Sequence, residues 1–526
     1  MPLIGEVSRT QWRPNYSKLR SKACREKSAE VIVPCEDSAR EGLNPTEVNI
    51  VKHHQMKGRT QKISAQYDGH PQKNRPEAKG YEGVQTFMRV MDGYITTEQP
   101  KREYPLLEQI LSPGNLNAAY KQVKSNGGAP GIDKLDCDRL HGYLREHGEQ
   151  LTESIRQRTY RPNPVRRVEI PKDNGKMRLL GIPTVVDRVI QQAIAQVLTP
   201  IYERQFSEGS YGFRPRRGGK KALVKATEII SQGYHYAVDI DLERFFDTVN
   251  HAKLIEILQR TIKDDAVISL IHKYLNSGVM VNGRYEEAWE GTPQGGPLSP
   301  LLANILLNEL DKELERRGHP FVRYADDGLI FCNSRRAAER VKESITRFIE
   351  STLILRVNRE KTECAYVGKL KFLGYGFYIR KGKCRLRLHQ KTEAKMRRRL
   401  KTITSRSNGM GYAKRKQALA EYLRGWTEYY NLADMGSKVK EIDKWLRRRI
   451  RMCIWKAWKR PRTRVQNLIK CGIDKRQAYE WGNTSQGYWR IAHSWIASRA
   501  MPDEALHRAG YVWIGCYYKA SALPKG

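Results

Sequence analysis

Two groups of aspartates lie in apolar segments of this 526-residue sequence, where carboxylates are costly to bury without partners. Asp326 and Asp327 interrupt the run FVRYADDGLIF, and Asp239 and Asp241 lie in VDIDL. Because neighbouring strand residues point to opposite faces, the adjacent pair is best placed on a tight hairpin turn. Asp239 and Asp241 are two residues apart and would share one strand face. The pattern predicts a sheet that presents carboxylates from two strands.

Such a set of carboxylates is suited to holding divalent cations. Hard ions such as Mg²⁺ take oxygen ligands, commonly one or two carboxylates together with substrate phosphates. A pair of these ions about 4 Å apart stabilises the attacking and leaving oxygens of a displacement at phosphorus. Asp-Asp-Gly is also ordinary turn chemistry, so residues 324–327 alone are compatible with a plain hairpin. The two groups together favour metal-dependent phosphoryl transfer.

The elements that must position these side chains are short strands alternating with helices. Apolar segments with strand character occupy residues 165–170, 236–242, 321–332 and 371–379. Helical spacing starts near Tyr104, in PLLEQIL and NLNAAYKQV, which are separated by a break at 112–114. This alternation predicts an α+β fold, with a sheet backed by helices.

The region after about residue 381 is predicted to be helical and is strongly basic. Residues 381–500 contain 32 Lys and Arg against 8 Asp and Glu, and eight of the ten Trp residues follow position 425. Cations interleaved with aromatic rings suit RNA, because they can contact its phosphates and its unstacked bases. The alternative is that Trp455 and Trp458 are buried anchors of a helical bundle.

The overall composition indicates a polyanionic partner. Lys and Arg number 95 against 57 Asp and Glu, a net charge of +38, and such cations bind nucleic acid by displacing its condensed counterions. None of the nine cysteines has CxxC spacing, which argues against a zinc ribbon. No apolar run approaches the roughly 20 residues of a membrane span. We therefore expect a nucleic-acid-binding protein of the cytoplasm, with reduced thiols and no membrane contact.

An ordered series of motifs runs from residue 115 to residue 377. Its members are NLNAAYKQVKSNGGAPGID, RRVEIPKDNGKMRLLGIPTVVDRVIQQAI, SYGFRPRRG, VDIDLERFFDTVNH, GTPQGGPLSPLLANILLNELD, RYADDGLIF, LRVNREKTE and KFLGYGF. In this order they resemble the motifs of reverse transcriptases encoded by bacterial group II introns, in the compact class that lacks an HNH endonuclease domain. The resemblance implies a right-hand polymerase, with fingers and palm, followed by an all-α thumb that is also the maturase domain.

The resemblance also implies an order of domains. We expect a largely disordered N-terminal extension (1–100), the family's N-terminal segment with the fingers (101–235), the palm with the catalytic aspartates (236–380), the helical thumb or maturase domain X (381–480) and a DNA-binding-like region without endonuclease (481–526). Shorter relatives begin near Met91, so a start codon at that position is a further hypothesis.

Carried over to this sequence, the resemblance makes Asp241, Asp326 and Asp327 the catalytic, metal-binding residues. Asp241 is preferred to Asp239 because the family's catalytic aspartate lies five residues before the aromatic that precedes Asp247. The metal ions implied are two Mg²⁺.

The resemblance assigns substrate contacts as well. The aromatic before Asp247 is Phe246, whose ring would exclude a ribose 2′-hydroxyl and so select deoxynucleotides. Its alternative is a core phenylalanine, with Phe245 as packed neighbour or as rival. Gln294 and Gly295, in GTPQGG, lie where backbone must approach a nucleotide closely, and glycine permits such an approach.

The remaining assignments are cations. Lys176 and Arg178 fall where the family holds the triphosphate, although either could be a solvated hairpin cation. Lys361 lies where polymerases often keep a general acid for the pyrophosphate leaving group. The predicted nucleic-acid contacts of the thumb are Arg447, Arg448, Arg449, Arg451, Lys456, Lys459, Arg460 and Arg462.

The residues and the resemblance together predict an RNA-directed DNA polymerase encoded by a group II intron. It would use dNTPs, an RNA template and a DNA primer to copy intron RNA at a target DNA during retrohoming. It would also bind the intron RNA and assist splicing without chemistry of its own. One alternative is a domesticated relative used in defence or repair, and another is a splicing-only RNA-binding protein with an inactive polymerase.

Overall fold

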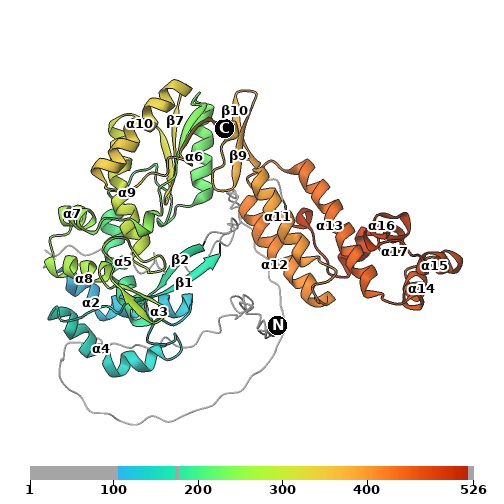
Figure 1. Cartoon of the computed structure of the whole chain (residues 1–526), viewed down its shortest axis with the longest axis horizontal. Coiled ribbons are helices and arrows are strands. Elements are labelled where there is room, and N and C mark those ends of the chain that lie inside the picture. Colours follow the sequence, from blue (N-terminus) through green and yellow to red (C-terminus); the bar gives the residue numbers. More distant parts are fainter. Residues whose placement is uncertain (1–104, 172–176, 519–526) are drawn as a thin grey trace, which may run out of the picture.

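The computed structural model describes residues 105–171 and 177–518. The predicted N-terminal extension, 1–100, lies outside the described residues. In Figure 1 the chain passes from blue and cyan helices, through a green and yellow sheet region, to an arm of orange and red helices. We use the names fingers, palm and thumb for these three parts, each defined below by its elements, whose bounds differ from the predicted domain boundaries; those boundaries stay a prediction.

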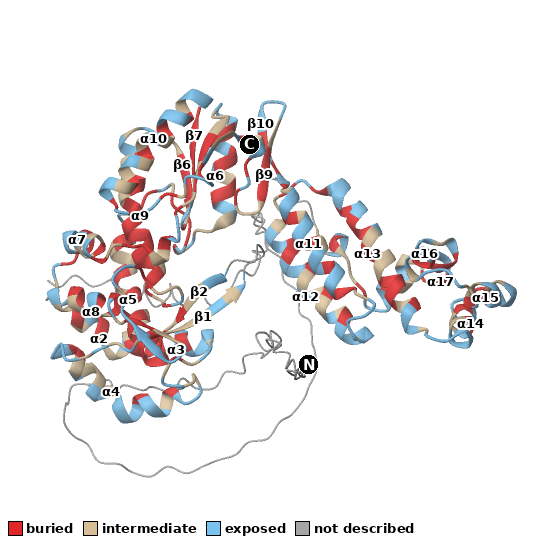
Figure 2. Ribbon diagram, in the orientation of Figure 1, coloured by how far each residue is buried: buried red, intermediate tan, exposed pale blue. Residues whose placement is uncertain are grey.

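The fingers surround one long buried helix. Their elements are α2 (Leu106–Leu111), α3 (Pro113–Asn126), α4 (Leu140–Arg156), β1 (Val165–Pro171), β2 (Met177–Ile182), α5 (Val185–Glu203), α7 (His251–Thr261), α8 (Asp265–Leu275), β4 (Val279–Val281) and β5 (Arg284–Glu286). Most of α5 is buried (Figure 2), and the hydroxyl of Thr184 caps it by accepting from the backbone N–H of Asp187. Pro113 is already the first residue of α3, so the break predicted at 112–114 is confined to Ser112.

The fingers also contain a four-stranded sheet with the strand order β2-β1-β4-β5. β1 and β2 form an antiparallel hairpin, whereas β4 runs parallel to β1. This sheet brings β4, although remote in sequence, beside β1, and the backbone N–H of Gly181 in β2 donates to the carbonyl of Gln294 in the loop that follows β5.

The palm is an antiparallel sheet with helices against both faces. Its elements are α6 (Gly219–Ser231), β3 (Tyr236–Ile240), α9 (Ser299–Arg316), β6 (Phe321–Tyr324), β7 (Asp327–Cys332), α10 (Arg335–Thr352) and β8 (Glu363–Tyr366), with the strand order β6-β7-β3-β8. Alternate residues of β3 enter different cores. Val238 packs into the core that includes α9 and α10, whereas Ala237 packs into the core that includes α6. The predicted strands at 165–170, 236–242 and 321–332 are confirmed in outline, the last of them as a hairpin.

The thumb begins with a strand hairpin and continues as helices. Its elements are β9 (Tyr375–Arg380), β10 (Lys383–Leu388), α11 (Gln390–Ile403), α12 (Tyr412–Tyr430), α13 (Gly436–Ala457), α14 (Pro461–Lys470), α15 (Lys475–Gly482), α16 (Tyr488–His493), α17 (Trp495–Ala500) and α18 (Asp503–Arg508). Its core is continuous with the α6 face of the palm sheet. Trp455 is buried in that core and Trp458 packs against it, so the alternative of buried anchors is confirmed for this pair.

Two sequence expectations about this region are wrong in detail. The strand expected at 371–379 begins only at Tyr375, because Leu373 and Gly374 have positive φ and form a tight turn that pairs Phe372 with Tyr375. The chain does not become helical at 381, since β10 intervenes and buries alternate residues against the core.

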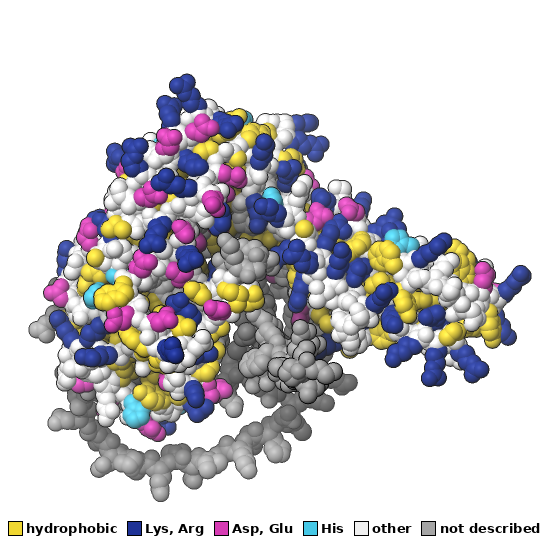
Figure 3. Space-filling view, viewed as in Figure 1, with side chains coloured by type: hydrophobic (Ala, Val, Ile, Leu, Met, Phe, Trp, Pro, Cys, Tyr) yellow, Lys and Arg dark blue, Asp and Glu magenta, His cyan; other side chains and the backbone are white. Residues whose placement is uncertain are grey.

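The described surface of the thumb is predominantly basic. Figure 3 shows many Lys and Arg side chains, and few Asp and Glu, over the helices of the arm. No helix within 105–171 or 177–518 combines the length and apolarity that crossing a membrane requires.

Candidate active site

The β6–β7 hairpin and the end of β3 bring the three predicted aspartates together. Tyr324 pairs with Asp327 across the hairpin, so that Ala325 and Asp326 form its two-residue turn. Ala325 has φ 57°, a left-handed conformation that a two-residue hairpin turn requires but alanine seldom adopts. β3 pairs with β7, and Asp241 follows the last residue of β3 directly. The charges of Asp326 and Asp241 both act on Asp327, as expected of neighbours.

The cluster of aspartates concentrates negative charge at one end of the sheet. Burial, and then the charges of Asp326 and Asp241, raise the pKa of Asp327 to about 6. Burial, followed by the charges of Asp327, Glu363 and Asp241, raises the pKa of Asp239 to about 7. Carboxylates that resist ionisation because they face one another are suited to a bound cation, which would remove the repulsion.

The donor set fits a metal site that substrate completes. Among residues 105–171 and 177–518, no three His, Cys, Asp or Glu side chains are gathered closely enough to hold an ion by themselves. Mg²⁺ in nucleotide-using enzymes usually takes only one or two carboxylates and fills its other positions with phosphate oxygens and water. The aspartates present therefore suit hard cations that arrive with a phosphorylated substrate.

Lys361 contacts this centre directly, and the charges of Lys371 and Lys361 partly offset the rise in the pKa of Asp327. Its Nζ lies 2.8 Å from Oδ2 of Asp241, and its side chain is 63% exposed. The backbone around the pair is fixed, because the N–H of Asn358 donates to the carbonyl of Asp241. The structure thus places Lys361 beside a predicted metal ligand, with most of its side chain open to solvent.

A buried arginine supports the catalytic turn from beneath. Arg323 is 3% exposed and forms an ion pair with Asp311 of α9, which is fully buried. Its guanidinium also donates to the carbonyl of Ala325 (2.9 Å), to Oδ1 of Asn304 (3.0 Å) and to Oγ of Ser210 (2.9 Å). These bonds tie the turn to α9 and to the loop before α6. Sequence reasoning missed this network, although an arginine within a buried strand signals a buried partner.

The two phenylalanines after Asp241 have different environments. Both lie in a short 3-10 helix, η2 (Phe245–Asp247), with their rings edge to face at 5.2 Å. Phe245 is 3% exposed and belongs to the core, whereas Phe246 is half-buried and lines a cavity of about 470 Å³. Gln294 lines the same cavity. Phe246, rather than Phe245, therefore faces space that a nucleotide could enter.

The structure explains why position 295 is a glycine. Gly295 has φ 134°, and a Cβ there would lie 2.5 Å from the carbonyl oxygen of Gly181 in β2. The backbone N–H of Gly181 donates to the carbonyl of Gln294 at 2.9 Å. Glycine is thus required at 295 where this loop meets the backbone of β2, and the approach to a nucleotide stays a prediction.

Of the two predicted triphosphate contacts, Lys176 and Arg178, only Arg178 lies within the described residues. Lys176 lies outside the described residues. Arg178 is exposed on β2, opposite Ile170 of β1. Its side chain is open to solvent and available to an anion.

The predicted thumb contacts fall into two groups. Arg447 pairs with Asp503 at 2.8 Å, and Arg449 donates to the hydroxyl of Thr404 at 2.7 Å. Arg451 is buried and donates to the carbonyl of Met501 and to Asp503, so it cannot reach a bound nucleic acid. The other group is Arg448, which is half-buried, and the exposed Lys456, Lys459, Arg460 and Arg462.

An antiparallel sheet with aspartates on two adjoining strands, in a chain that also has a cavity of ligand size lined by Phe246 and Gln294, is the arrangement of a metal-dependent nucleotide polymerase. Residues 170–377 match the family model for reverse transcriptase (RNA-dependent DNA polymerase), and residues 394–472 match the maturase-specific domain of group II introns. The chain belongs to the group II intron-encoded reverse transcriptases, which are RNA-directed DNA polymerases that carry a maturase domain. This family generally uses divalent metal ions, with RNA and DNA as template and primer.

Individual relatives agree with this assignment. Protein YkfC of Escherichia coli (strain K12) is 32% identical over 333 residues, which cover 56% of this chain and 87% of YkfC. The group II intron-encoded protein LtrA of Lactococcus lactis subsp. cremoris is 33% identical over 342 residues, which cover 52% of this chain and 57% of LtrA. The chain thus spans little more than half the length of LtrA.

Among solved structures, a partial Cas6-RT-Cas1–Cas2 complex is similar at 28% identity. The similarity covers 49% of this chain and 45% of that one, with a TM-score of 0.32. The assignment to the family therefore rests on the sequence matches and on the geometry of the palm.

Proposed function

We propose that this protein copies group II intron RNA into DNA during retrohoming and binds the same RNA to assist its splicing. The observation that carries the first half is the convergence of Asp241, Asp326 and Asp327 at the ends of β3 and β7. The second half rests on the maturase match at 394–472 and on the basic surface of the thumb. The domain boundaries given above and a cytoplasmic location belong to the same proposal.

The cofactor we propose is a pair of Mg²⁺ ions, held by Asp241, Asp326 and Asp327. When bound, the ions would activate the primer 3′-oxygen and stabilise the leaving pyrophosphate. Phe246 would lie against the sugar of the incoming dNTP and exclude a 2′-hydroxyl. Lys361 would donate a proton from Nζ to the departing pyrophosphate oxygen.

The remaining contacts orient the substrates. Arg178, with Lys176, would hold the triphosphate by charge-assisted hydrogen bonds, and Gln294 would contact the nucleotide in the cavity that it lines together with Phe246. Arg448, Lys456, Lys459, Arg460 and Arg462 would contact RNA phosphates. Splicing chemistry would remain with the RNA.

Separating the two activities tests this proposal. Asp326→Asn should abolish extension of a DNA primer on an RNA template and leave binding of the intron RNA and its splicing intact. The matched control is Asp265→Asn, which removes an exposed aspartate from the first turn of α8 and should change neither activity. Loss of both activities in Asp326→Asn, in a variant as stable as the parent, would contradict the division of roles.

The splicing-only alternative makes the opposite forecast. A protein of that kind would support splicing and show no primer extension even with all three aspartates present. A domesticated relative would extend primers without any intron in the flanking DNA, so sequencing RNA that co-purifies with the protein separates that alternative.

A further inference from the structure

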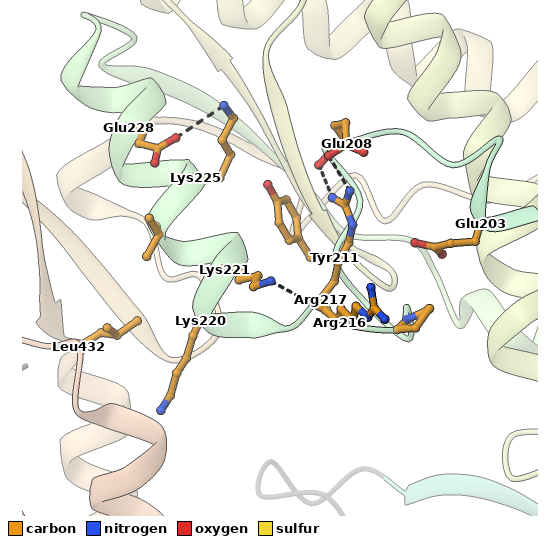
Figure 4. Close-up of a pocket in the computed structure, with 12 residues that line it drawn as sticks. Glu203, Glu208, Tyr211, Arg216, Arg217, Lys220, Lys221, Lys225, Glu228 and Leu432 are labelled. Carbon is orange, nitrogen blue, oxygen red and sulfur yellow. Dashed lines mark hydrogen bonds and ion pairs between the residues drawn. The ribbon is translucent and has the colours of Figure 1, made fainter. Parts of the chain in front are cut away.

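Cavities of ligand size in the described part of the chain have walls of different kinds. One, of about 680 Å³, is lined largely by charged side chains of α6 and of the loop before it, among them Lys220 and Lys221 (Figure 4). The cavity of about 470 Å³ beside Phe246 is different, because Gly291 and Thr292 also line it. One peptide group joins these two residues, so the orientation of that group helps to shape the space beside Phe246.

The peptide group between Gly291 and Thr292 is hydrogen-bonded at both of its polar atoms. Its N–H, which belongs to Thr292, donates to the carbonyl of Phe246 at 2.6 Å. Its carbonyl oxygen, which belongs to Gly291, lies 2.7 Å from Nε2 of His251. Because a carbonyl can only accept, Nε2 carries the proton and donates. A single peptide group thus links the imidazole of His251 to the backbone of Phe246.

The imidazole of His251 is itself held in place. His251 is the first residue of α7 and is 7% exposed. Its Nδ1 lies 2.9 Å from Oδ1 of Asn276, the residue that follows α8. The ring therefore has a partner at each nitrogen. Burial alone would make His251 an ordinary satisfied core residue, but its partner at Nε2 belongs to the wall of the cavity.

The loop before α9 approaches η2 so closely that position 291 requires glycine. Gly291 has φ 93°, and a Cβ there would lie 3.0 Å from the carbonyl oxygens of Phe246 and Asp247. Its N–H donates to the carbonyl of Val249 at 2.7 Å. Glycine restricts the rotation of the peptide group that follows it less than any other residue does. A donor from outside the loop is therefore needed to fix that peptide group, and His251 supplies it.

We propose that His251 is a positioning residue for sugar selection, which acts on Phe246 through the Gly291–Thr292 peptide group. This inference rests on the proposed role of Phe246 and adds the residue that holds it in place. His251 is not among the residues that line the cavity, so it acts through the peptide group and not on the nucleotide. Its hydrogen bond to the carbonyl also polarises the peptide group and strengthens the donation to Phe246. Without it the peptide group can rotate, and Phe246 can retreat from the ribose 2′-hydroxyl.

The test compares two substitutions of His251 in the full-length protein. Glutamine places an N–H about where Nε2 of histidine lies and keeps a donor for Gly291, whereas asparagine reaches only as far as Nδ1. The measurement is single-nucleotide addition to a DNA primer on an RNA template, as the ratio of kcat/KM for a dNTP to kcat/KM for the matching rNTP. His251→Asn should lower this ratio by about tenfold or more, and His251→Gln should keep it within about threefold of the parent.

Two controls separate positioning from stability. Arg451→Met removes contacts within the thumb and should leave the ratio unchanged even though it destabilises the protein. Phe246→Ala removes the proposed selecting ring and should lower the ratio at least as far as His251→Asn does. Because His251 acts through Phe246, the double variant Phe246→Ala/His251→Asn should lose no more selectivity than Phe246→Ala alone.

A second position on the same ring covers the case in which His251→Asn does not fold. Asn276→Ala frees only Nδ1 of His251, so the imidazole keeps its proton for Gly291 but loses its orientation. This variant should lower the ratio by a smaller factor, about threefold. An unchanged ratio in a folded Asn276→Ala would then decide against the proposal.

Three other outcomes would overturn it. The first is an unchanged ratio in His251→Asn when Phe246→Ala lowers the ratio. The second is an equal loss in His251→Asn and His251→Gln, which would make the donor to Gly291 irrelevant. The third is a double variant whose losses add. A ratio that Phe246→Ala leaves unchanged would instead refute the proposed role of Phe246, and the role of His251 with it.

Discussion

The palm and the thumb differ in how they compensate their charged side chains. Where β3 ends and β7 begins, carboxylates face one another, and burial, followed by the charges of Asp326 and Asp241, raises the pKa of Asp327 to about 6, although Lys371 and Lys361 act against the rise. In α13, by contrast, Arg447, Arg449 and Arg451 are each satisfied by an acceptor from a neighbouring segment. Charge that the fold leaves uncompensated is available to a ligand, whereas charge that the fold compensates holds the protein together.

The largest expected effect follows from removing one uncompensated charge. Asp327→Asn should reduce primer extension by at least about a thousandfold, because a metal ligand is lost. The same change should raise the unfolding temperature by about 2 °C at pH 8, since it removes repulsion that ionised Asp327 suffers there. Thermal unfolding without metal, beside an extension assay, measures both. A lower unfolding temperature of Asp327→Asn than of the parent would show that repulsion between these carboxylates does not destabilise the palm.

The buried ion pair of Arg323 and Asp311 combines the two cases. Its charges compensate each other, and Arg323 also supports the turn that carries Asp326. Arg323→Met leaves Asp311 charged and unpaired, and should cost about 3 to 5 kcal/mol of stability. The double variant Arg323→Met/Asp311→Leu should recover most of that stability, because an apolar pair can replace a buried ion pair.

Activity should not recover with stability. The double variant still lacks the donor to the carbonyl of Ala325, so the catalytic turn loses a fixed contact and extension should stay reduced by about a hundredfold. Denaturant unfolding and single-nucleotide addition, measured on the same samples, separate the effects. Full activity in the stable double variant would limit Arg323 to a structural role.

The sequence predicted the hairpin and its neighbours because their causes are local. Asp-Asp-Gly between two apolar runs specifies a tight turn, and strand alternation places Asp239 and Asp241 on one face. The partner of Arg323 could not be predicted in the same way. Asp311 lies on α9, and only the packing of that helix against the sheet brings the two side chains together.

The glycines in the sequence indicated where the backbone is constrained, but not which neighbouring group constrains it. Gly295 was predicted to let the backbone approach a nucleotide, which stays a prediction, whereas the close approach that the structure shows is to the carbonyl of Gly181, because β2 lies against that loop. Similarly, the aromatic run at 371–379 indicated a strand, and Gly374 converted its first residues into a turn. In the first case the missing information was the position of another segment of the chain, and in the second it was the backbone conformation of Leu373 and Gly374 themselves.

The thumb offers a matched comparison of compensated and free cations. Arg451→Met should lower stability by about 2 kcal/mol, because the carbonyl of Met501 and the carboxylate of Asp503 lose a donor. Lys459→Gln/Arg462→Gln, at exposed positions, should leave unfolding within about 0.5 kcal/mol of the parent. It should instead weaken RNA binding and reduce its salt slope by about 1 to 2. Equal effects of both changes on stability would erase the distinction between the groups.

The smallest expected effect is a pH dependence of stability in the palm. Asp327 and Asp239 have raised pKa values in the folded protein, about 6 and about 7, so the folded state holds their protons at pH values where the unfolded chain has released them. Their contribution to stability is therefore complete below about pH 4 and is lost as pH rises to 7. Because both side chains are partly exposed, the loss should be on the order of 1 kcal/mol.

Comparison with Asp239→Asn/Asp327→Asn isolates this contribution from all other titrating groups. In EDTA, the stability of the parent relative to this variant should fall between pH 4 and pH 7. Mg²⁺ should reduce the fall, since a cation favours the ionised carboxylates. A difference that stays flat with pH in EDTA would mean that the aspartates are already compensated without metal, and the contrast between palm and thumb would then fail.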